Sequence, residues 1–139
     1  MTYDDQVAAL RVVPLFGGLS DKELLSVLVD AQDRVYAAGQ DIVTQGDAGD
    51  WFFLILEGRA KVLIDGAPRR TLGPGQYFGE MSLIDQEPRS ATVRAEADVR
   101  GLSIPSATFL GILEHNWSIA RKVMANLSRR LRSHDREGE

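Results

Sequence analysis

The chain has 139 residues, of which 44% are hydrophobic and 26% charged, and its formal net charge at pH 7 is -4. This length suits one domain that buries its core without disulfides or a structural metal. The charge balance is ordinary for a globular protein and argues against a strongly basic nucleic-acid binder. The absence of cysteine excludes disulfides, thiolate nucleophiles and cysteine-ligated zinc.

The N-terminus carries early acidic residues and lacks the basic region and apolar core of a signal peptide. The longest apolar run, residues 51–56, is too short to span a bilayer. We therefore expect a cytoplasmic protein without a membrane partner.

Two helices are predicted within the first thirty residues. Residues 5–12 have the pattern of a short amphipathic helix that ends before Pro14. In the second helix Ser20 is a suitable N-cap, and Glu23 completes a capping box ahead of an apolar run. We expect both helices to lie at the periphery of the domain.

Between residues 31 and 104 the pattern changes to short apolar or β-branched runs separated by turn residues, at a spacing of about 8–12 residues. Such a pattern is typical of a barrel or a double-sheet sandwich. We predict seven or eight strands in a mainly β fold with flanking helices. The expected fold is a double-stranded β-helix, that is, a jelly-roll-like barrel, with N-terminal helices and two C-terminal helices.

Helical periodicity returns after Ile104. A short helix is predicted to begin at Pro105, and Asn116 is a suitable cap for a longer one. In the longer helix, apolar residues repeat at alternating spacings of three and four, as in a heptad seam. They are Trp117, Ala120, Met124, Leu127 and Leu131. The seam has two interpretations, packing on the chain's own β-region or a homodimer through the C-terminal helix, and periodicity does not separate them.

The same helix carries a local excess of basic residues, for which a solvated face is the usual explanation. They are Arg121, Lys122, Arg129, Arg130, Arg132 and Arg136. No helix-turn-helix follows the long helix before residue 139, so we do not expect DNA to be a partner of this chain.

Residues 78–93, FGEMSLIDQEPRSATV, place a carboxylate and a guanidinium close together in the chain. A single helical turn is predicted to begin near Gly79, and its free backbone N–H groups would form an anion site. Arg89 offers paired donors to phosphate oxygens. The carboxylate of Glu80 would repel a phosphate, but it could accept a hydrogen bond from a sugar hydroxyl. Glu80 and Arg89 together therefore suit a ribose phosphate. A ligand-free Glu80–Arg89 ion pair is the alternative, and the chemistry alone leaves both open.

The order of Gly, Glu, Pro, Arg and a small pair in this segment resembles the phosphate-binding cassette of the cyclic nucleotide-binding domain family. That family includes catabolite activator-type transcription factors, regulatory subunits of cyclic-nucleotide-dependent kinases and cyclic-nucleotide-gated channels. The resemblance extends upstream through AAGQDIVTQGDAGDWFFLILEGRAKV and covers roughly residues 14–131.

The resemblance implies that Glu80 accepts from the ribose 2′-OH and that Arg89 pairs with the cyclic phosphate. The position of Ser90 holds Ala in relatives that bind cyclic AMP and often Thr in those that bind cyclic GMP. Cyclic AMP is favoured here, cyclic GMP is possible, and no cofactor is expected. The implied ligand-binding residues are Gly79, Glu80, Met81, Ser82, Arg89, Ser90 and Ala91, with Val62 and Leu72 beside the base. The final helix is expected to act as a lid through Arg129, Arg130, Arg132 and Ser133.

Residues 1–139 are accordingly predicted to form a single cyclic nucleotide-binding domain. It comprises N-terminal helices at 1–30, a β-barrel at 31–104 with the cassette at 78–92, hinge and lid helices at 105–133, and a polar tail at 134–139.

The predicted function is a sensor that transmits nucleotide occupancy through its C-terminal helices to an unknown protein partner or effector domain. One alternative is a nucleotide-independent protein-interaction module that uses the same barrel and heptad helix. Another is a fragment of a larger transcription factor or channel. The only histidines, His115 and His134, lie outside the β-region, so we predict no catalytic or metal site and no enzyme activity.

Overall fold

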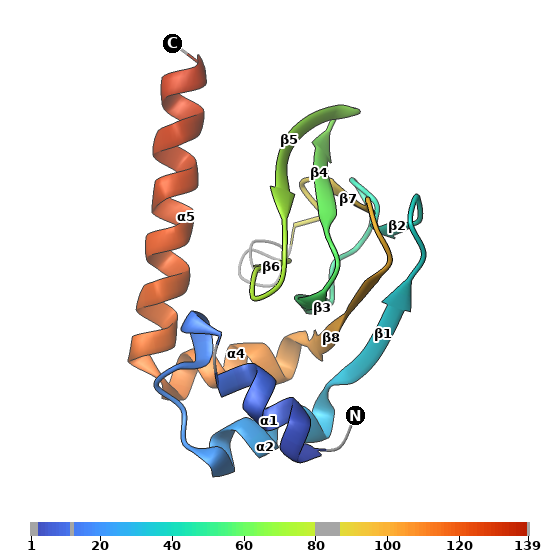
Figure 1. Ribbon diagram of the computed structural model, residues 1–139. Helices are drawn as coiled ribbons and strands as arrows, with labels where there is room; N and C mark the ends of the chain where they lie inside the picture. Colours follow the sequence, from blue (N-terminus) through green and yellow to red (C-terminus); the bar gives the residue numbers. More distant parts are fainter. Residues whose placement is uncertain (1–2, 12, 80–86, 139) are drawn as a thin grey trace.

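A computed structural model of the chain describes residues 3–11, 13–79 and 87–138. Its strands form two four-stranded antiparallel sheets, a first sheet in the order β1-β8-β3-β6 and a second in the order β2-β7-β4-β5 (Figure 1). The mainly β, jelly-roll-like class is thereby confirmed, although the described strands make two facing sheets rather than a closed barrel. The bounds are β1 Gln32–Tyr36, β2 Asp41–Val43, β3 Trp51–Glu57, β4 Ala60–Ile64, β5 Ala67–Leu72, β6 Tyr77–Phe78, β7 Thr92–Ala95 and β8 Val99–Pro105.

Tight turns set the register of these strands. The β4–β5 hairpin pairs Ile64 with Ala67 across Asp65 and Gly66, which both have positive φ. An Asp-Gly pair of this kind suits a two-residue hairpin loop. Farther along, Gln76 N–H donates to the Gly73 carbonyl at 3.1 Å and closes a turn. That turn separates the end of β5 from β6.

The N-terminal elements are α1 (Tyr3–Arg11), the 3-10 helix η1 (Pro14–Phe16) and α2 (Asp21–Asp30). The predicted capping box is present: Ser20 Oγ accepts from Glu23 N–H at 3.2 Å, and Glu23 Oε1 accepts from Ser20 N–H at 3.1 Å. The hydrogen bond from the Ser20 N–H, with hydrogen bonds from the side chains of Ser20 and Asn116, holds the pKa of the Glu23 carboxyl below its ordinary value.

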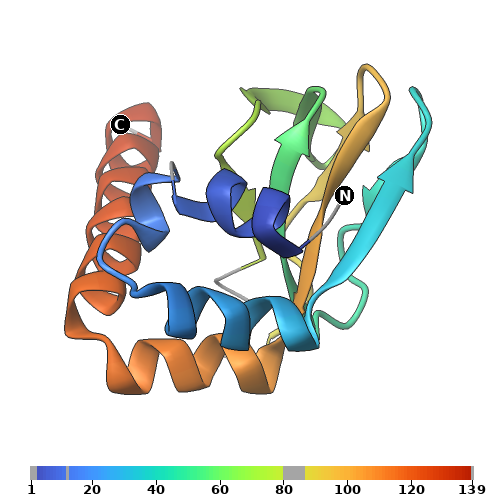
Figure 2. The ribbon, with the colours of Figure 1, turned by 60° about the horizontal axis from the view of Figure 1, so that its bottom comes forward.

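The expectation that these helices are peripheral is wrong in one respect. They lie outside the two sheets (Figure 2), but Leu10, Phe16 and Leu24 are fully buried. The reason is that the outer face of the first sheet is itself apolar and must be covered. The helices supply part of that cover and so contribute buried residues to the core.

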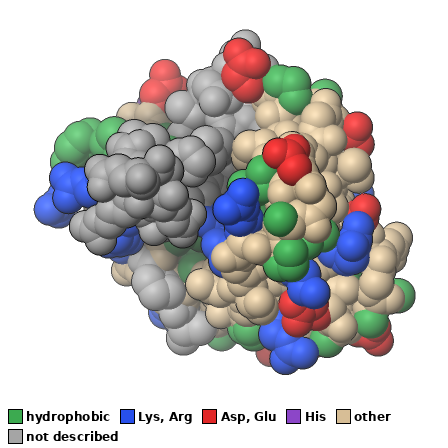
Figure 3. All heavy atoms as spheres, turned by 90° about the horizontal axis from the view of Figure 1, so that it is seen from above, with side chains coloured by type: hydrophobic (Ala, Val, Ile, Leu, Met, Phe, Trp, Pro, Cys, Tyr) green, Lys and Arg blue, Asp and Glu red, His purple; other side chains and the backbone are tan. Residues whose placement is uncertain are grey.

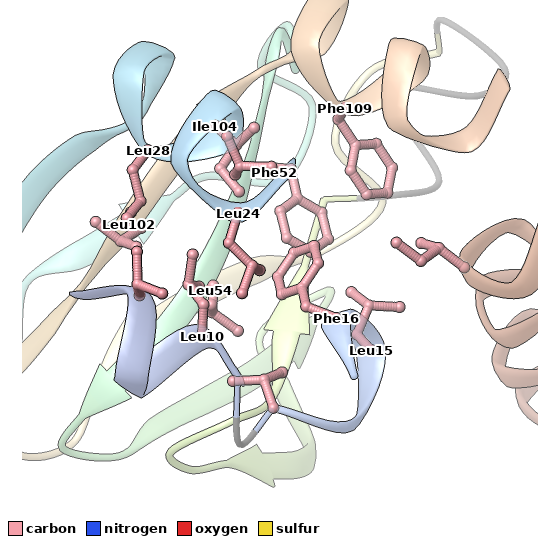
Figure 4. Close-up of a cluster of buried hydrophobic side chains, with 14 of the residues drawn as sticks. Leu10, Leu15, Phe16, Leu24, Leu28, Phe52, Leu54, Leu102, Ile104 and Phe109 are labelled. Carbon is pink, nitrogen blue, oxygen red and sulfur yellow. The ribbon is translucent and has the colours of Figure 1, made fainter. Parts of the chain in front are cut away.

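The core therefore consists of two clusters on opposite faces of the first sheet. The helix-side cluster, shown in Figure 4, joins the helices to the outer face of β3 and β8. Its buried members are Val7, Leu10, Val13, Leu15, Phe16, Leu24, Val27, Leu28, Phe52, Leu54, Leu102, Ile104, Phe109, Ile119 and Val123.

The inter-sheet cluster fills the space between the two sheets. Its buried members are Ile42, Val43, Phe53, Ile55, Ala60, Val62, Leu72, Phe78, Val93, Ala95 and Val99. Strand β3 serves both clusters, because Phe52 and Leu54 face the helices while Phe53 and Ile55 face the second sheet. Burial on both faces explains why β3 reads as a continuous apolar run.

Two helices follow the sheets: α4 (Ser106–His115) and α5 (Trp117–Gly138). We predict that this helix begins at Pro105. In the structure Pro105 is instead the N-cap residue, and α4 begins one residue later, at Ser106. Helix α4 runs beside α2 (Figure 2), and Thr108 Oγ1 donates to Asp30 Oδ2 at 3.1 Å. None of the described helices is long and apolar enough to cross a membrane.

Helix α5 does pack on the chain's own core, but only part of the predicted heptad seam takes part in that packing. Trp117 is 70% exposed and Met124 48% exposed. Helix α5 instead packs through Ile119 and Val123, which are buried in the helix-side cluster, with Leu127 partly buried against it. The side chain of Leu131 lies outside the described residues.

Candidate functional site

Arg89 is the one charged side chain that is buried among the described residues, with 5% of its surface exposed. Its Nη2 donates to the backbone carbonyl of Trp51 at 2.7 Å. Its Cζ lies over the indole of Trp51, 4.8 Å from the ring centroid, a favourable cation–π distance. Charged side chains are seldom buried without a structural or functional reason, so Arg89 marks this region as the candidate site.

Gly79 brings the backbone directly against this guanidinium. Its φ is +99°, a conformation that L side chains rarely adopt. A Cβ at this position would lie 2.5 Å from Arg89 Nη1 and 2.9 Å from the Trp51 carbonyl oxygen. Only glycine leaves the guanidinium in its observed place.

The backbone of Arg89 is held by the loop between β2 and β3. Arg89 N–H donates to the Asp47 carbonyl at 2.8 Å, and the Arg89 carbonyl accepts from Gly46 N–H at 2.9 Å. Next to this pair, Gln45 N–H donates to Thr92 Oγ1 at 2.9 Å. The backbone of Arg89 is therefore anchored to the β2–β3 loop, while its guanidinium is held at the first residue of β3.

The same loop is tied to the β4–β5 hairpin. Gln45 Nε2 donates to Asp65 Oδ1 at 3.0 Å, and Gln45 Oε1 accepts from Asp65 N–H at 2.8 Å. Both ends of the glutamine amide are thus satisfied by a residue at the hairpin tip. The loop that holds Arg89 is consequently braced against the second sheet.

The structure brings several of the predicted ligand residues together. Gly79 and Arg89 are in contact, and Ala91 packs against the inter-sheet cluster that contains Val62 and Leu72. The latter two are 4% and 3% exposed, so they can offer a ligand only a small apolar surface. Ser90 is exposed. Predictions for Glu80, Met81 and Ser82, and for the helical turn near Gly79, lie outside the described residues.

The predicted lid residues lie on α5, far along the chain from the cassette. Arg129 and Arg132 are exposed. The side chains of Arg130 and Ser133 lie outside the described residues. Figure 1 shows α5 rising from α4 at the base of the molecule, to the left of the two sheets. The lid assignment therefore stays a prediction.

Several other charged side chains of the described surface lie in ion pairs. Figure 3 shows Lys and Arg side chains next to Asp and Glu side chains over the described part of the face seen from above. In the second sheet, Arg94 Nε lies 2.7 Å from Asp41 Oδ1 and Arg59 Nε lies 3.1 Å from Glu96 Oε2. The hydrogen bond and charge of Asp41 raise the pKa of Arg94 above its ordinary value. Arg89 differs from these arginines in its burial and in its contacts with backbone and ring.

The sequence did not point to Trp51 or to the loop residues Gly46 and Asp47 as parts of this site. A tryptophan at the start of a strand ordinarily indicates core packing. No local pattern pairs residue 51 with residue 89, because the contact depends on how β3 and the segment before β7 meet in space. The family resemblance covers Gly46 and Asp47, but it does not predict their backbone hydrogen bonds to Arg89.

Comparison with known proteins agrees with this architecture. Residues 33–116 match the model of the family described as "Cyclic nucleotide-binding domain". The cyclic AMP receptor protein of Thermus thermophilus is 37% identical over 129 residues, which are 89% of this chain and 60% of that protein. The solved structure of the Thermus thermophilus catabolite activator protein superposes with a TM-score of 0.77 at 36% identity, over 89% of this chain and 61% of that one.

A second solved structure, cAMP-bound PfPKA-R, has a TM-score of 0.89 at 24% identity, over 98% of this chain and 47% of that one, and supports the fold alone. The chain belongs to the cyclic nucleotide-binding domain family, which confirms the resemblance seen in the cassette. The match covers 60% of the length of the Thermus receptor protein.

Proposed function

We propose that this chain binds a cyclic nucleotide, with cyclic AMP favoured over cyclic GMP, and that Arg89 pairs with the cyclic phosphate. The observation that carries the proposal is the burial of the Arg89 guanidinium against Gly79 and Trp51 in a family whose model matches this region. A guanidinium held in one place presents its donors to a phosphate at a low cost in side-chain entropy. The Thermus relative, a cyclic AMP receptor protein by name, supports the choice of nucleotide.

In the same proposal Glu80 accepts from the ribose 2′-OH, and the backbone at Gly79, Met81 and Ser82 approaches the sugar and phosphate. Ser90 and Ala91 complete the cassette. Val62 and Leu72 lie beside the base. Residues 1–139 then act as a single sensor domain whose role is regulation and not catalysis.

Transmission would run through the helix-side cluster to the C-terminal helices. Ile119 and Val123 join α5 to the same β3 strand that carries Trp51, so a shift at the site can reach α5 through packed side chains. Trp117 and Met124 stay exposed on α5 and offer an apolar stripe to a second copy of the chain. The lid would be supplied by residues 129–133, and a protein partner or effector would respond to the movement of α5.

Calorimetry with cyclic AMP tests the phosphate assignment. Arg89→Ala should weaken binding by about a hundredfold or more, because two charge-assisted hydrogen bonds are lost. Arg89→Lys keeps the charge but loses the paired donors and should weaken binding less. Arg94→Ala is the matched control, since this arginine is exposed and pairs with Asp41. Normal affinity in Arg89→Ala would contradict the proposal.

A second function is favoured by the exposure of Trp117 and Met124, which would serve a partner-binding module without any nucleotide. Thermal unfolding with cyclic AMP and with cyclic GMP separates the two functions. A ligand that binds only the folded state must raise the melting temperature. A rise with cyclic AMP that exceeds the rise with cyclic GMP supports the sensor, and no rise with either nucleotide supports the partner-binding module.

A further inference from the structure

Trp51 contacts Arg89 in two independent ways, through its backbone carbonyl and through its ring. We infer that Trp51 is the positioning residue of the site, whose indole holds the Arg89 guanidinium in the orientation that receives a phosphate. The inference rests on the proposed function, because the phosphate belongs to the proposed nucleotide. The position of Arg89 in the ligand-free chain can nevertheless be tested without a nucleotide.

The two contacts constrain different motions of the guanidinium. The hydrogen bond from Nη2 to the Trp51 carbonyl, 2.7 Å long, fixes one edge of the planar group. The indole covers the group, with Cζ 4.8 Å from the ring centroid, and limits its tilt. Because the N–H donors lie in the plane of a guanidinium, a ring contact holds the group without occupying a donor. The contact with Gly79 limits it from a third side.

The indole is itself held in place by neighbouring rings. Its centroid lies 5.9 Å from that of Phe53 in an edge contact and 6.5 Å from that of Phe78 in a tilted one. Phe53 and Phe78 are buried in the inter-sheet cluster. Trp51 therefore joins the long side chain of Arg89 to the packed interior. Such preorganisation raises affinity because less side-chain entropy is lost on binding.

A second arginine contacts the same ring and provides a matched control. Arg34 on β1 places its Cζ 5.6 Å from the Trp51 centroid, and its Nη2 donates to Gln32 Oε1 at 2.8 Å. Arg34 is exposed, whereas Arg89 is buried. Arg34→Gln removes one cation from the indole and leaves both contacts of Arg89 unchanged.

Substitution of Trp51 isolates the contribution of the ring, because every variant keeps the backbone carbonyl. Trp51→Leu should weaken cyclic AMP binding by about threefold to thirtyfold, the range of a partly desolvated cation–π contact. Trp51→Phe keeps a smaller ring and should lose less. Arg34→Gln should stay within about twofold of the wild-type chain. In the Arg89→Lys background, Trp51→Leu should have little further effect, because the group that the ring positions is gone.

The closing experiment combines that calorimetry with NMR of the Arg89 Nε–H signal in the ligand-free chain, assigned by its loss in Arg89→Lys. The ring current should shift this signal in the wild-type chain, less in Trp51→Phe, and not in Trp51→Leu, while Arg34→Gln leaves it shifted. An unshifted wild-type signal, or equal cyclic AMP affinity of wild type and Trp51→Leu, overturns the positioning role.

The two measurements also separate this inference from the proposed function. Failure of the wild-type chain to bind cyclic AMP or cyclic GMP overturns the proposed function, and with it the phosphate role of Arg89. The NMR signal still decides whether Trp51 holds the guanidinium. If Trp51→Leu fails to fold, Trp51→Phe carries the test, since a shift and an affinity equal to those of the wild-type chain would contradict the inference.

Discussion

The two faces of the first sheet are buried by different means. On the outer face, helices from both ends of the chain pack on β3 and β8, and Phe52 stacks on Phe109 with ring centroids 4.3 Å apart. On the inner face, the second sheet covers Phe53 and Ile55, and the candidate site with Arg89 lies beside this interior. One face thus contacts the helices that would transmit a signal, and the other contacts the residues that would receive it.

Strand β3 is therefore common to the proposed binding site and to the proposed route of transmission. Its alternating side chains belong to opposite clusters, while its first residue, Trp51, contacts Arg89. A strand buried on both faces cannot shift without disturbing packing on each side. The two clusters can be separated experimentally by changing a residue on one face at a time.

The largest effect is expected on the helix side. Phe109→Ala should lower the free energy of unfolding by about 3–5 kcal/mol, because a fully buried ring is replaced by a cavity. That is a large share of the about 5–15 kcal/mol of a typical domain. Leu110→Ala, next on α4 and 37% exposed, should cost below about 1 kcal/mol. Urea denaturation measures the loss of stability in both variants. A loss in Phe109→Ala as small as that in Leu110→Ala would show that the helices contribute little to the core.

A smaller effect is expected at the site side, from Gly79→Ala. The variant must accommodate a positive φ, which costs about 1–2 kcal/mol, and a Cβ that overlaps Arg89. Gly75→Ala has a similar φ, +86°, and no neighbouring atom within 4 Å, so it suffers only the backbone strain. Calorimetry with cyclic AMP should find weaker binding by about tenfold in Gly79→Ala alone. Equal affinities of the two variants would contradict the role of the Gly79–Arg89 contact.

The smallest effect concerns an ion pair between β1 and β8 of the first sheet. Arg100 donates from Nε to Asp33 Oδ1 at 3.2 Å and from Nη2 to Oδ2 at 2.6 Å. The hydrogen bonds from Arg100, reinforced by its charge, lower the pKa of Asp33 in the folded state. Stability from this pair is present above the unfolded pKa of about 3.9 and is lost as the pH falls through the lower folded pKa.

Asp33→Asn should therefore be less stable than the wild-type chain near pH 7, by below about 1 kcal/mol because the pair is partly exposed. The difference should begin to shrink as the pH falls below about 4 and should vanish once the pH is below the folded pKa of Asp33. Urea denaturation at a series of pH values measures it, and Arg100→Gln should behave alike because it removes the same pair. A difference that persists undiminished in acid would mean that Asp33 acts through something other than its charge.

Several features were predictable because they depend on neighbouring residues. The capping box at Ser20 and Glu23 requires only a spacing of three. The cassette was recognisable from its order of residue types, and the family match agrees with it. Alternation of apolar runs and turns was enough for a jelly-roll-like fold.

The face of α5 that packs was not predictable in the same way. The seam through Trp117 and Met124 and the face through Ile119 and Val123 are both apolar stripes with helical spacing. Which of them is buried depends on where η1 and α4 lie around the helix. Periodicity describes a helix alone, whereas burial depends on its neighbours.

The sequence by itself determined the class of fold, the cassette and the family, since these follow from local patterns and from the order of residue types. The burial of β3 on both faces and the contribution of the N-terminal helices to the core follow only from the packing of the whole chain. The same packing brings Trp51 into contact with Arg89, which lies 38 residues later in the chain. The physical reason is that capping, turns and periodicity act over a few residues, while these contacts arise only when distant strands and helices pack together.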